Sequence, residues 1–313
     1  MSDLRLVDPK KIKRNPENPR LIFRTEELKA LEDSIAQQGI LVPLTLYRDG
    51  RDQVLLDGER RWRCAIKLGM ATVPVIEQPK PDRLQNIMMM FAIHNARKDW
   101  DPLPTAYKLR DLETLFQKRH GRQPKERELA ELASLKPGEV RRLRKLLNLP
   151  EQYHKELLAE LEKPKSEQTL TVDHVLEATK AAAALRKREV VTSNEEENNL
   201  RRAIIDKFRS KVIKNTVDPR KLARMARAVE RGEVTMGTAR REVRALVTRK
   251  TYSIDDAFEA SVAEADFRHS LQQLSERLTA KLEEFKEHDY EPDDALRTAL
   301  RALLKAAQRT LGG

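Results

Sequence analysis

The sequence is poor in the residues that build disulfides, cysteine-based metal centres and membrane spans. Its 313 residues include one cysteine, Cys64, which excludes an internal disulfide and a zinc site made of cysteines. No apolar run approaches the roughly 18 residues that a membrane-spanning helix needs. The N-terminus also lacks the apolar stretch of a signal peptide. We therefore expect a cytoplasmic protein without a membrane partner.

Aromatic residues are also scarce, at 4% of the chain, whereas charged residues make up 35%. This composition favours several small helical cores over one large enzyme barrel. The net charge is +11, so a polyanion is the first partner to consider. The charge is unevenly spread: +4 over 1–100, +5 over 101–150, −4 over 151–200, +11 over 201–250 and −5 over 251–313.

The first 80 residues alternate between predicted strands and helices. A strand in "LRLV" stops before Pro9, and a helix over 26–38 begins after Thr25 as its cap and ends at Gly39. Further strands are predicted at 40–47, 53–56 and 71–77, with a short helix within 57–69. This pattern is typical of one small mixed α/β domain.

The remainder is predicted to be entirely helical, which makes the fold class α+β. Helices are expected at 104–119, 125–134 and 138–148, and two more follow Asp218 as cap with Pro219 at the first helical position. Leucine and phenylalanine recur at steps of three or four over 258–311, interrupted by "EHDYEPDD", which predicts an amphipathic hairpin. We expect four units: 1–100, 101–190, 191–250 and 251–313.

The segment "DGERRWRCAIKLG" at 57–69 places three arginines at the start of a helix. A helix N-terminus has unpaired N–H groups and a partial positive charge, so it attracts anions. Arginine side chains there would oppose the dipole unless a phosphate lies between them. The residues alone leave two interpretations open, a phosphate site and a solvated basic face.

The basic block 201–250 is a second candidate surface. Its predicted helices carry arginines that suggest contact with DNA, namely Arg240, Arg241 and Arg244 on one helix and Arg220, Arg224 and Arg227, with Lys221, on the other. The alternative is that this block docks the acidic tail of the same chain or of a neighbouring one. The 255–311 hairpin favours dimerisation, with an intramolecular cap as its alternative.

Four boxes in order resemble the ParB family of chromosome- and plasmid-partition proteins. "GERRWRC", set between a strand and a helix, is similar to the family's GERRxRA box. "NPENPR" resembles its first box and "QQGILVPLTLY" its Gly-x-x-x-Pro strand. "ELAELASLKPGEVRRLRKLLNLP" aligns without gaps to its helix-turn-helix and the Leu-Pro after it. The resemblance covers about residues 1–150.

The resemblance implies a ParB/sulfiredoxin-like N-terminal domain that binds CTP, followed by a helix-turn-helix that binds double-stranded DNA. It further implies a homodimeric sliding clamp or spreading factor in DNA segregation, associated with the nucleoid or a plasmid, with a ParA-type ATPase as partner. Carried over by position, the nucleotide-binding residues would be Arg20, Gly39, Pro43, Gly58, Glu59, Arg60, Arg61 and Arg63.

The third box departs from the family. Where the family has Glu-Asn, then two residues and an arginine, this chain reads "IHNARKDWDP". Aligned without a gap, Arg97 matches the arginine, and Ile93 and His94 replace the Glu-Asn pair. Sliding the alignment by one residue places His94 and Asn95 there instead and breaks the arginine spacing. Magnesium prefers oxygen ligands. CTP with Mg²⁺ as companion ion is implied, but the missing carboxylate counts against hydrolysis, and no catalytic residue or metal ligand is assigned.

In the helix-turn-helix, the second helix is expected to enter the major groove. Val140, Leu143, Leu146 and Leu147 would form its buried side. Its candidates for DNA contact are Lys136, Arg141, Arg142, Arg144 and Lys145.

Two other classes of function stay open. One is an enzyme on the same fold, such as a nuclease or a kinase. A sulfiredoxin would need a nucleophilic cysteine at the turn, but Cys64 lies about one helical turn further on, and a nuclease would need clustered carboxylates. The other is a DNA-binding regulator or silencer with a degenerate nucleotide site, which the altered third box favours.

Overall fold

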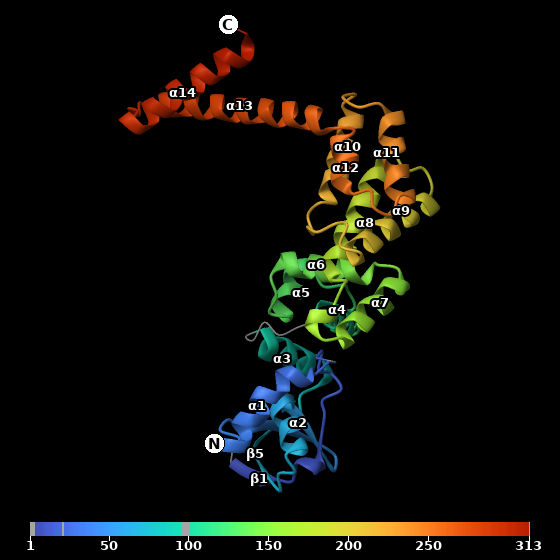
Figure 1. The fold of residues 1–313 in the computed structure, drawn as a ribbon. Coiled ribbons are helices and arrows are strands. Elements are labelled where there is room, and N and C mark those ends of the chain that lie inside the picture. The colour runs from blue at the N-terminus through green and yellow to red at the C-terminus, as the bar shows by residue number, and fades with distance from the viewer. Residues whose placement is uncertain (1–3, 21, 96–100, 313) are drawn as a thin grey trace.

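The molecule is elongated, as a computed structural model that describes residues 4–20, 22–95 and 101–312 shows. A small sheet domain occupies one end, a helical body follows, and two long C-terminal helices project from the far end (Figure 1). The sheet followed by helices confirms the predicted α+β class. Within the described ranges, no helix is both long and apolar enough to cross a membrane.

The N-terminal sheet has five strands in the order β1-β5-β3-β4-β2. They are β1 (Leu4–Val7), β2 (Ile12–Lys13), β3 (Leu44–Asp49), β4 (Asp52–Asp57) and β5 (Val73–Gln78), with a 3-10 turn, η1 (Pro9–Lys11), after β1. β3 pairs antiparallel with β4 and parallel with β5. The hairpin between β3 and β4 turns at Gly50, whose φ of 62° suits glycine.

Three helices complete this domain: α1 (Thr25–Gln38), α2 (Glu59–Lys67) and α3 (Arg83–Asn95). Side chains alternate across the sheet, so Leu44 and Leu46 pack with Ala65 of α2 on one face. Tyr47 and Val54 pack with α3 on the other face. The strand ends that carry functional side chains are thus fixed between two small cores.

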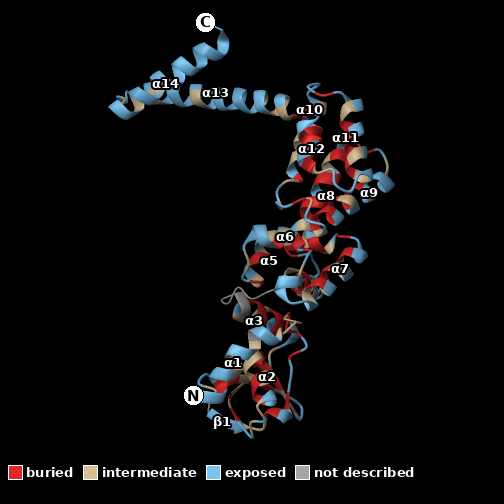
Figure 2. Ribbon diagram, in the orientation of Figure 1, coloured by how far each residue is buried: buried red, intermediate tan, exposed pale blue. Residues whose placement is uncertain are grey.

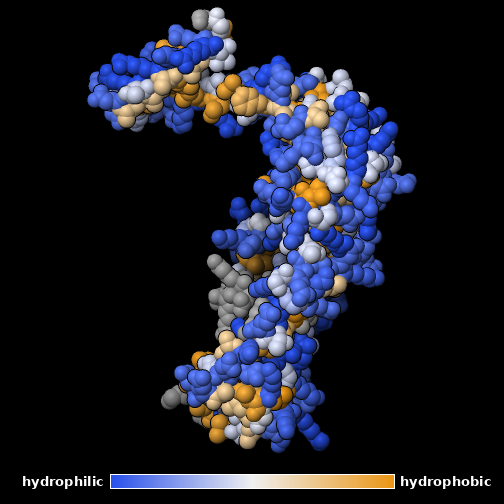
Figure 3. Space-filling view, viewed as in Figure 1, coloured by the Kyte–Doolittle hydropathy of each residue, from blue (hydrophilic) through white to orange (hydrophobic). Residues whose placement is uncertain are grey.

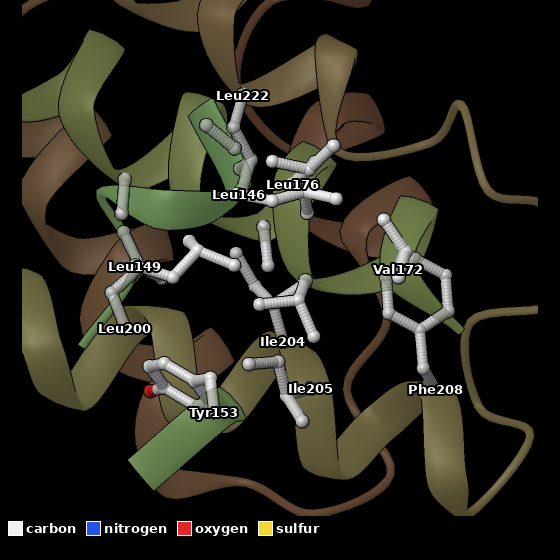
Figure 4. Close-up of a cluster of buried hydrophobic side chains, with 14 of the residues drawn as sticks. Leu146, Leu149, Tyr153, Val172, Leu176, Leu200, Ile204, Ile205, Phe208 and Leu222 are labelled. Carbon is white, nitrogen blue, oxygen red and sulfur yellow. The ribbon is translucent and has the colours of Figure 1, made fainter. Parts of the chain in front are cut away.

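The helical body shares one continuous core that runs from Leu84 to Val262. Its helices are α4 (Pro102–His120), α5 (Glu126–Leu132), α6 (Pro137–Leu147), α7 (Glu151–Glu162), α8 (Val172–Lys187), α9 (Asn194–Arg209), α10 (Arg220–Glu230), α11 (Met236–Thr248) and α12 (Ile254–Glu259), with a 3-10 turn, η2 (Lys165–Glu167). Figure 4 shows Leu146, Tyr153 and Ile204 meeting in this core. The predicted boundary between 190 and 191 falls inside it, so separate folding of the two units stays a prediction.

The predicted C-terminal hairpin forms two helices, α13 (Ala263–Glu287) and α14 (Asp294–Leu311), which we call the arm. α14 turns back after α13 but diverges from it in Figure 1. Neither helix has a buried residue in the part of the chain that the structure describes, and Figure 2 shows the arm as exposed. The predicted amphipathic pattern is present, but its apolar side is not covered within the chain.

Two predicted helix caps were wrong. Thr25 is the first residue of α1, and Arg24 precedes it without a side-chain cap. α10 begins at Arg220, so Pro219 is its cap residue rather than its first helical residue. Backbone bonds from Lys221 to Asp218 and from Leu222 to Pro219 form a tight turn there. That turn satisfies the first amides of the helix, so the Asp218 side chain is not needed as a cap.

Candidate functional site

The turn between β4 and α2 has a backbone that only glycine fits. Gly58 is the cap residue of α2, with φ of 99°, in the left-handed region. A Cβ atom at this position would lie 2.6 Å from Cδ2 of Leu44. Because the strand ends directly at the helix, the first turn of α2 and its backbone N–H groups lie at the edge of the sheet.

A cavity of about 260 Å³ opens at this turn. Two separate segments build it, the β4–α2 connection and the loop before α1. Its lining residues are Asn15, Asn18, Arg20, Phe23, Leu31, Leu55, Leu56, Asp57, Gly58, Glu59, Arg60 and Arg61. The lining therefore combines apolar side chains with arginines, amides and the carboxylates of Asp57 and Glu59. Such a mixture suits a ligand with a flat or apolar part and an anionic part.

The three arginines of α2 have different surroundings. Arg60 lines the cavity. Arg61 is anchored, because its guanidinium donates to the carbonyls of Val42 and Pro43, the latter at 3.0 Å, and to the Asp57 carboxylate at 3.2 Å. Arg63 lies over the ring of Phe23, 4.0 Å from its centroid. The loop before α1 therefore helps to position Arg63.

Glu59 is buried and connects the loop before α1 to Arg63 of α2. Its side chain is 5% exposed, and it accepts a hydrogen bond from Nδ2 of Asn18 at 2.7 Å and from Nη2 of Arg63 at 2.7 Å. Arg14 adds an ion pair at 3.5 Å. A buried carboxylate needs such partners. The geometry therefore gives Glu59 the role of orienting Arg63.

The cavity carboxylates do not fit a protein-bound Mg²⁺. Asp57 bonds to Arg61, and Glu59 bonds to Asn18 and Arg63. Across the described ranges, no three His, Cys, Asp or Glu side chains gather as a metal site. Burial raises the pKa of the Cys64 thiol, which donates to the carbonyl of Leu28 at 3.8 Å, as expected of a small buried residue rather than a nucleophile.

The other predicted nucleotide residues are more scattered. Arg20 lines the cavity, with its guanidinium 5.2 Å from the centroid of Phe23. Gly39 ends α1 with φ of 72°, and Pro43 lies at the other end of the loop that Arg61 anchors. His94 and Asn95 form the last turn of α3, and Arg97 lies outside the described residues.

Sequence reasoning missed several residues of the cavity. The cavity residues that were not among the predicted site residues are Asn15, Asn18, Phe23, Leu31, Leu55, Leu56 and Asp57. The motif "NPENPR" contained the signal for Asn15, because it lies in the same box as Arg20. The apolar members carried no such signal, since their spacing is that of ordinary core residues.

The predicted second DNA-contacting helix is α6, and its buried side is as expected. Val140, Leu143 and Leu146 are buried, while Leu147 is partly buried. Of the predicted contact residues, Lys136, Arg141 and Lys145 are exposed. Arg142 instead pairs with Asp173 of α8 at 2.8 Å, and Arg144 with Glu113 of α4. These two arginines join α6 to the neighbouring helices α8 and α4.

Several basic residues of the block 201–250 form ion pairs with acidic residues of the same chain. On α10, Arg220 pairs with Glu177, Lys221 with Asp255 and Arg224 with Asp266. The last two acidic partners belong to the C-terminal region, as the alternative of an intramolecular acidic tail anticipated. On α11, Arg240, Arg241 and Arg244 are all exposed. Arg240 donates to the carbonyl of Glu189 and Arg241 to Glu242, and Arg244 lines a groove with Val243 and Val247.

Comparison with known proteins agrees with the fold of the sheet domain. Residues 1–93 match the family model described as the ParB N-terminal domain. Residues 1–93 therefore resemble the N-terminal domain of the ParB family. It is 36% identical over 95 residues to the chromosome-partitioning protein Spo0J of Thermus thermophilus, which covers 30% of this chain and 35% of that protein. It is 40% identical over 75 residues to ParB of Caulobacter vibrioides, covering 23% and 24% of the two chains.

The match to these ParB relatives spans about a third of their length or less. Among solved structures, the C-terminally truncated ParB of Caulobacter crescentus complexed with CTP-gamma-S is 25% identical, covers 50% of this chain and 85% of that one, and has a TM-score of 0.29. The same protein complexed to the centromeric parS site is 19% identical, covers 77% and 98%, and has a TM-score of 0.38.

Proposed function

We propose that this chain binds CTP in the cavity at the β4–α2 turn and double-stranded DNA through α6. It would act in DNA segregation, at the nucleoid or on a plasmid, as a clamp or spreading factor switched by the nucleotide. The observation that carries the proposal is the convergence of Arg20, Arg60 and the N-terminus of α2 on one cavity that also has apolar lining residues. A nucleotide offers a base for the apolar residues and phosphates for the arginines.

Isothermal titration calorimetry with CTP, ATP, GTP and UTP in magnesium tests the nucleotide site. We expect micromolar binding of CTP, and weaker or no binding of the other three, because the boxes around the cavity resemble those of the ParB family. Binding of all four with equal affinity would contradict the selectivity. Binding of none would refute the nucleotide site itself.

The DNA proposal is supported by the exposed basic side chains of α6. Replacing Lys136 and Lys145 together by alanine is expected to weaken binding to duplex DNA. The slope of log affinity against log salt should become shallower by roughly 2, since each lost phosphate contact removes about 0.9. Fluorescence anisotropy over a salt series measures this slope. Lys155→Ala on α7, also exposed and basic, is the matched control, and an equal change in that variant would contradict the assignment.

A homodimer through the arm is the third part of the proposal. α13 carries exposed apolar side chains at helical spacing, with Phe267 70% and Leu274 63% exposed, and α14 carries Leu304 at 60%. Hydrophobic residues follow the arm in Figure 3. A second copy presents the same stripes, so two arms can cover each other as helices do in bundles. A ParA-type ATPase as further partner remains a proposal from the family alone.

A DNA-binding regulator or silencer with a degenerate nucleotide site is the second candidate. The observation that favours it is the third box, where Ile93 and His94 stand in place of a Glu-Asn pair. The calorimetric titration separates the two functions, because the regulator would bind duplex DNA without binding CTP.

A further inference from the structure

The loop from Asn15 to Arg20 contacts the cavity and the helical body at once. Asn15, Asn18 and Arg20 line the cavity. Glu17, between them, bonds instead to two helices: it accepts from Nε of Arg83 on α3 at 2.7 Å and from Nζ of Lys108 on α4 at 2.9 Å. One short loop therefore joins the nucleotide cavity to the start of the helical body.

The loop is held firmly at this junction. Asn15 and Asn86 of α3 exchange side-chain hydrogen bonds of 2.8 Å and 3.1 Å, and both are buried. Lys108 also donates to the carbonyl of Pro16 at 3.1 Å. A shift of the loop must therefore break bonds to α3 and α4 or carry those helices with it.

Glu17 is a charged group inside this junction, with 6% of its surface exposed. Burial alone would raise the pKa of Glu17, but the hydrogen bonds from Lys108 and Arg83 outweigh burial and lower it. The carboxylate is therefore ionised at neutral pH, and its bonds are charge-assisted. Among the described residues, the other acceptors near Nζ of Lys108 are the carbonyl of Pro16 and, at 3.5 Å, the carboxylate of Asp111. Removing the charge of Glu17 therefore weakens the main ionic contact of Lys108.

The contacts continue from α4 to the DNA-contacting helix. Lys108 and Glu113 lie on the same helix, α4, and Glu113 pairs with Arg144 of α6. α3 is shared between the two parts, because Met90 packs on the sheet while Leu84, Ile87 and Phe91 pack in the core of the helical body. The cavity is thus connected to α6 through the loop at Glu17, helix α4 and the ion pair between Glu113 and Arg144.

We propose that Glu17 is the residue through which occupancy of the cavity changes the affinity of α6 for DNA. This inference rests on the proposed function. A ligand that bonds to Asn18 or Arg20 moves the loop and alters the bonds of Glu17 to α3 and α4. Because coupling is reciprocal, DNA bound at α6 changes the affinity of the cavity by the same factor. Glu17 is a positioning residue and does not itself touch the nucleotide.

The test is the dissociation constant for CTP, measured by calorimetry with and without saturating sheared genomic DNA. In the wild type we expect the two constants to differ by about fivefold or more, the usual lower end of such couplings. In Glu17→Gln, an isosteric change, the ratio should fall close to one, while CTP binding without DNA changes less than about threefold. Glu151→Gln on α7, an exposed glutamate paired with Lys155, should keep the wild-type ratio.

Lys108→Met provides the second variant. If Glu17 acts through Lys108, this variant should also lose the coupling, and the double variant should lose no more than either single one. Urea unfolding of each variant separates loss of coupling from loss of fold, because destabilisation alone does not change the ratio of two constants. The role of Glu17 is overturned if Glu17→Gln keeps the wild-type ratio of the two CTP dissociation constants, or if that ratio is one in the wild type. Neither result affects the proposed nucleotide site. Absence of CTP binding to the wild type overturns the proposed nucleotide site, and the coupling with it.

Discussion

Arg60→Ala is expected to lower the affinity for CTP by about 10- to 100-fold, since a charge-assisted bond to phosphate contributes roughly 1.5–3 kcal/mol. The neighbouring Arg61 is expected to affect stability as well. Arg61 donates to Val42, Pro43 and Asp57 within the protein, so Arg61→Ala should also lower the free energy of unfolding by about 1–3 kcal/mol.

Calorimetry and urea unfolding on the same samples separate these effects. Arg51→Ala, an exposed arginine in the β3–β4 turn, is the matched control and should change neither quantity measurably. CTP binding by Arg60→Ala with wild-type affinity would contradict the placement of the phosphates. An Arg61→Ala protein as stable as the wild type would contradict the anchoring of the 39–43 loop.

Deleting the arm, residues 263–313, is expected to convert a dimer into a monomer. Sedimentation velocity should then report half the mass of the wild type. The melting temperature of the helical body should change little, because no described arm residue is buried and Val262, which is buried, is retained. Ala263, at the start of the arm, packs against the core but is only partly buried. The deletion does remove the ion pair between Arg224 and Asp266, which joins α10 to the arm. Loss of the dimer would follow from removal of the exposed apolar stripes rather than from damage to the core.

A full-length variant makes the same test without truncation. Leu274→Asp combined with Leu304→Asp places charges on both stripes and should give the same monomer. Thr279→Asp adds a charge to α13 away from the stripe and should leave the dimer intact. A wild-type protein that sediments as a monomer at all concentrations would refute the arm as a dimer interface, as would a dimer that survives the double substitution.

Local patterns predicted the elements of this fold well. The alternation of strands and helices, the turn at Gly58 and the buried face of α6 at Val140, Leu143 and Leu146 all followed from spacing and glycine position. Such features depend on residues a few positions apart, and the sequence displays them directly. The helix caps were less predictable, because a backbone turn can satisfy the same amides as a side chain.

The partners of charged residues could not be predicted. Arg142 and Asp173 are 31 positions apart, as are Arg144 and Glu113, and Asn18 lies 41 positions before Glu59. A basic side chain looks the same in a sequence whether it faces DNA, a phosphate or a distant carboxylate. The cavity required the loop before α1 to lie beside α2, which depends on the packing of the whole domain. Spacing within one helix carries no information about that packing.

The length of α13 has a consequence for how two protomers would search for DNA. Its 25 residues form a helix roughly 37 Å long that leaves the helical body with no covering element. In a dimer joined through the arms, the two helical bodies would stay within a limited distance of each other. When one helical body is bound to DNA, the other would therefore remain at a high effective concentration near the same duplex. Avidity would then depend on the geometry of the spacer, and lengthening or shortening α13 by whole turns would tune it without altering any DNA contact.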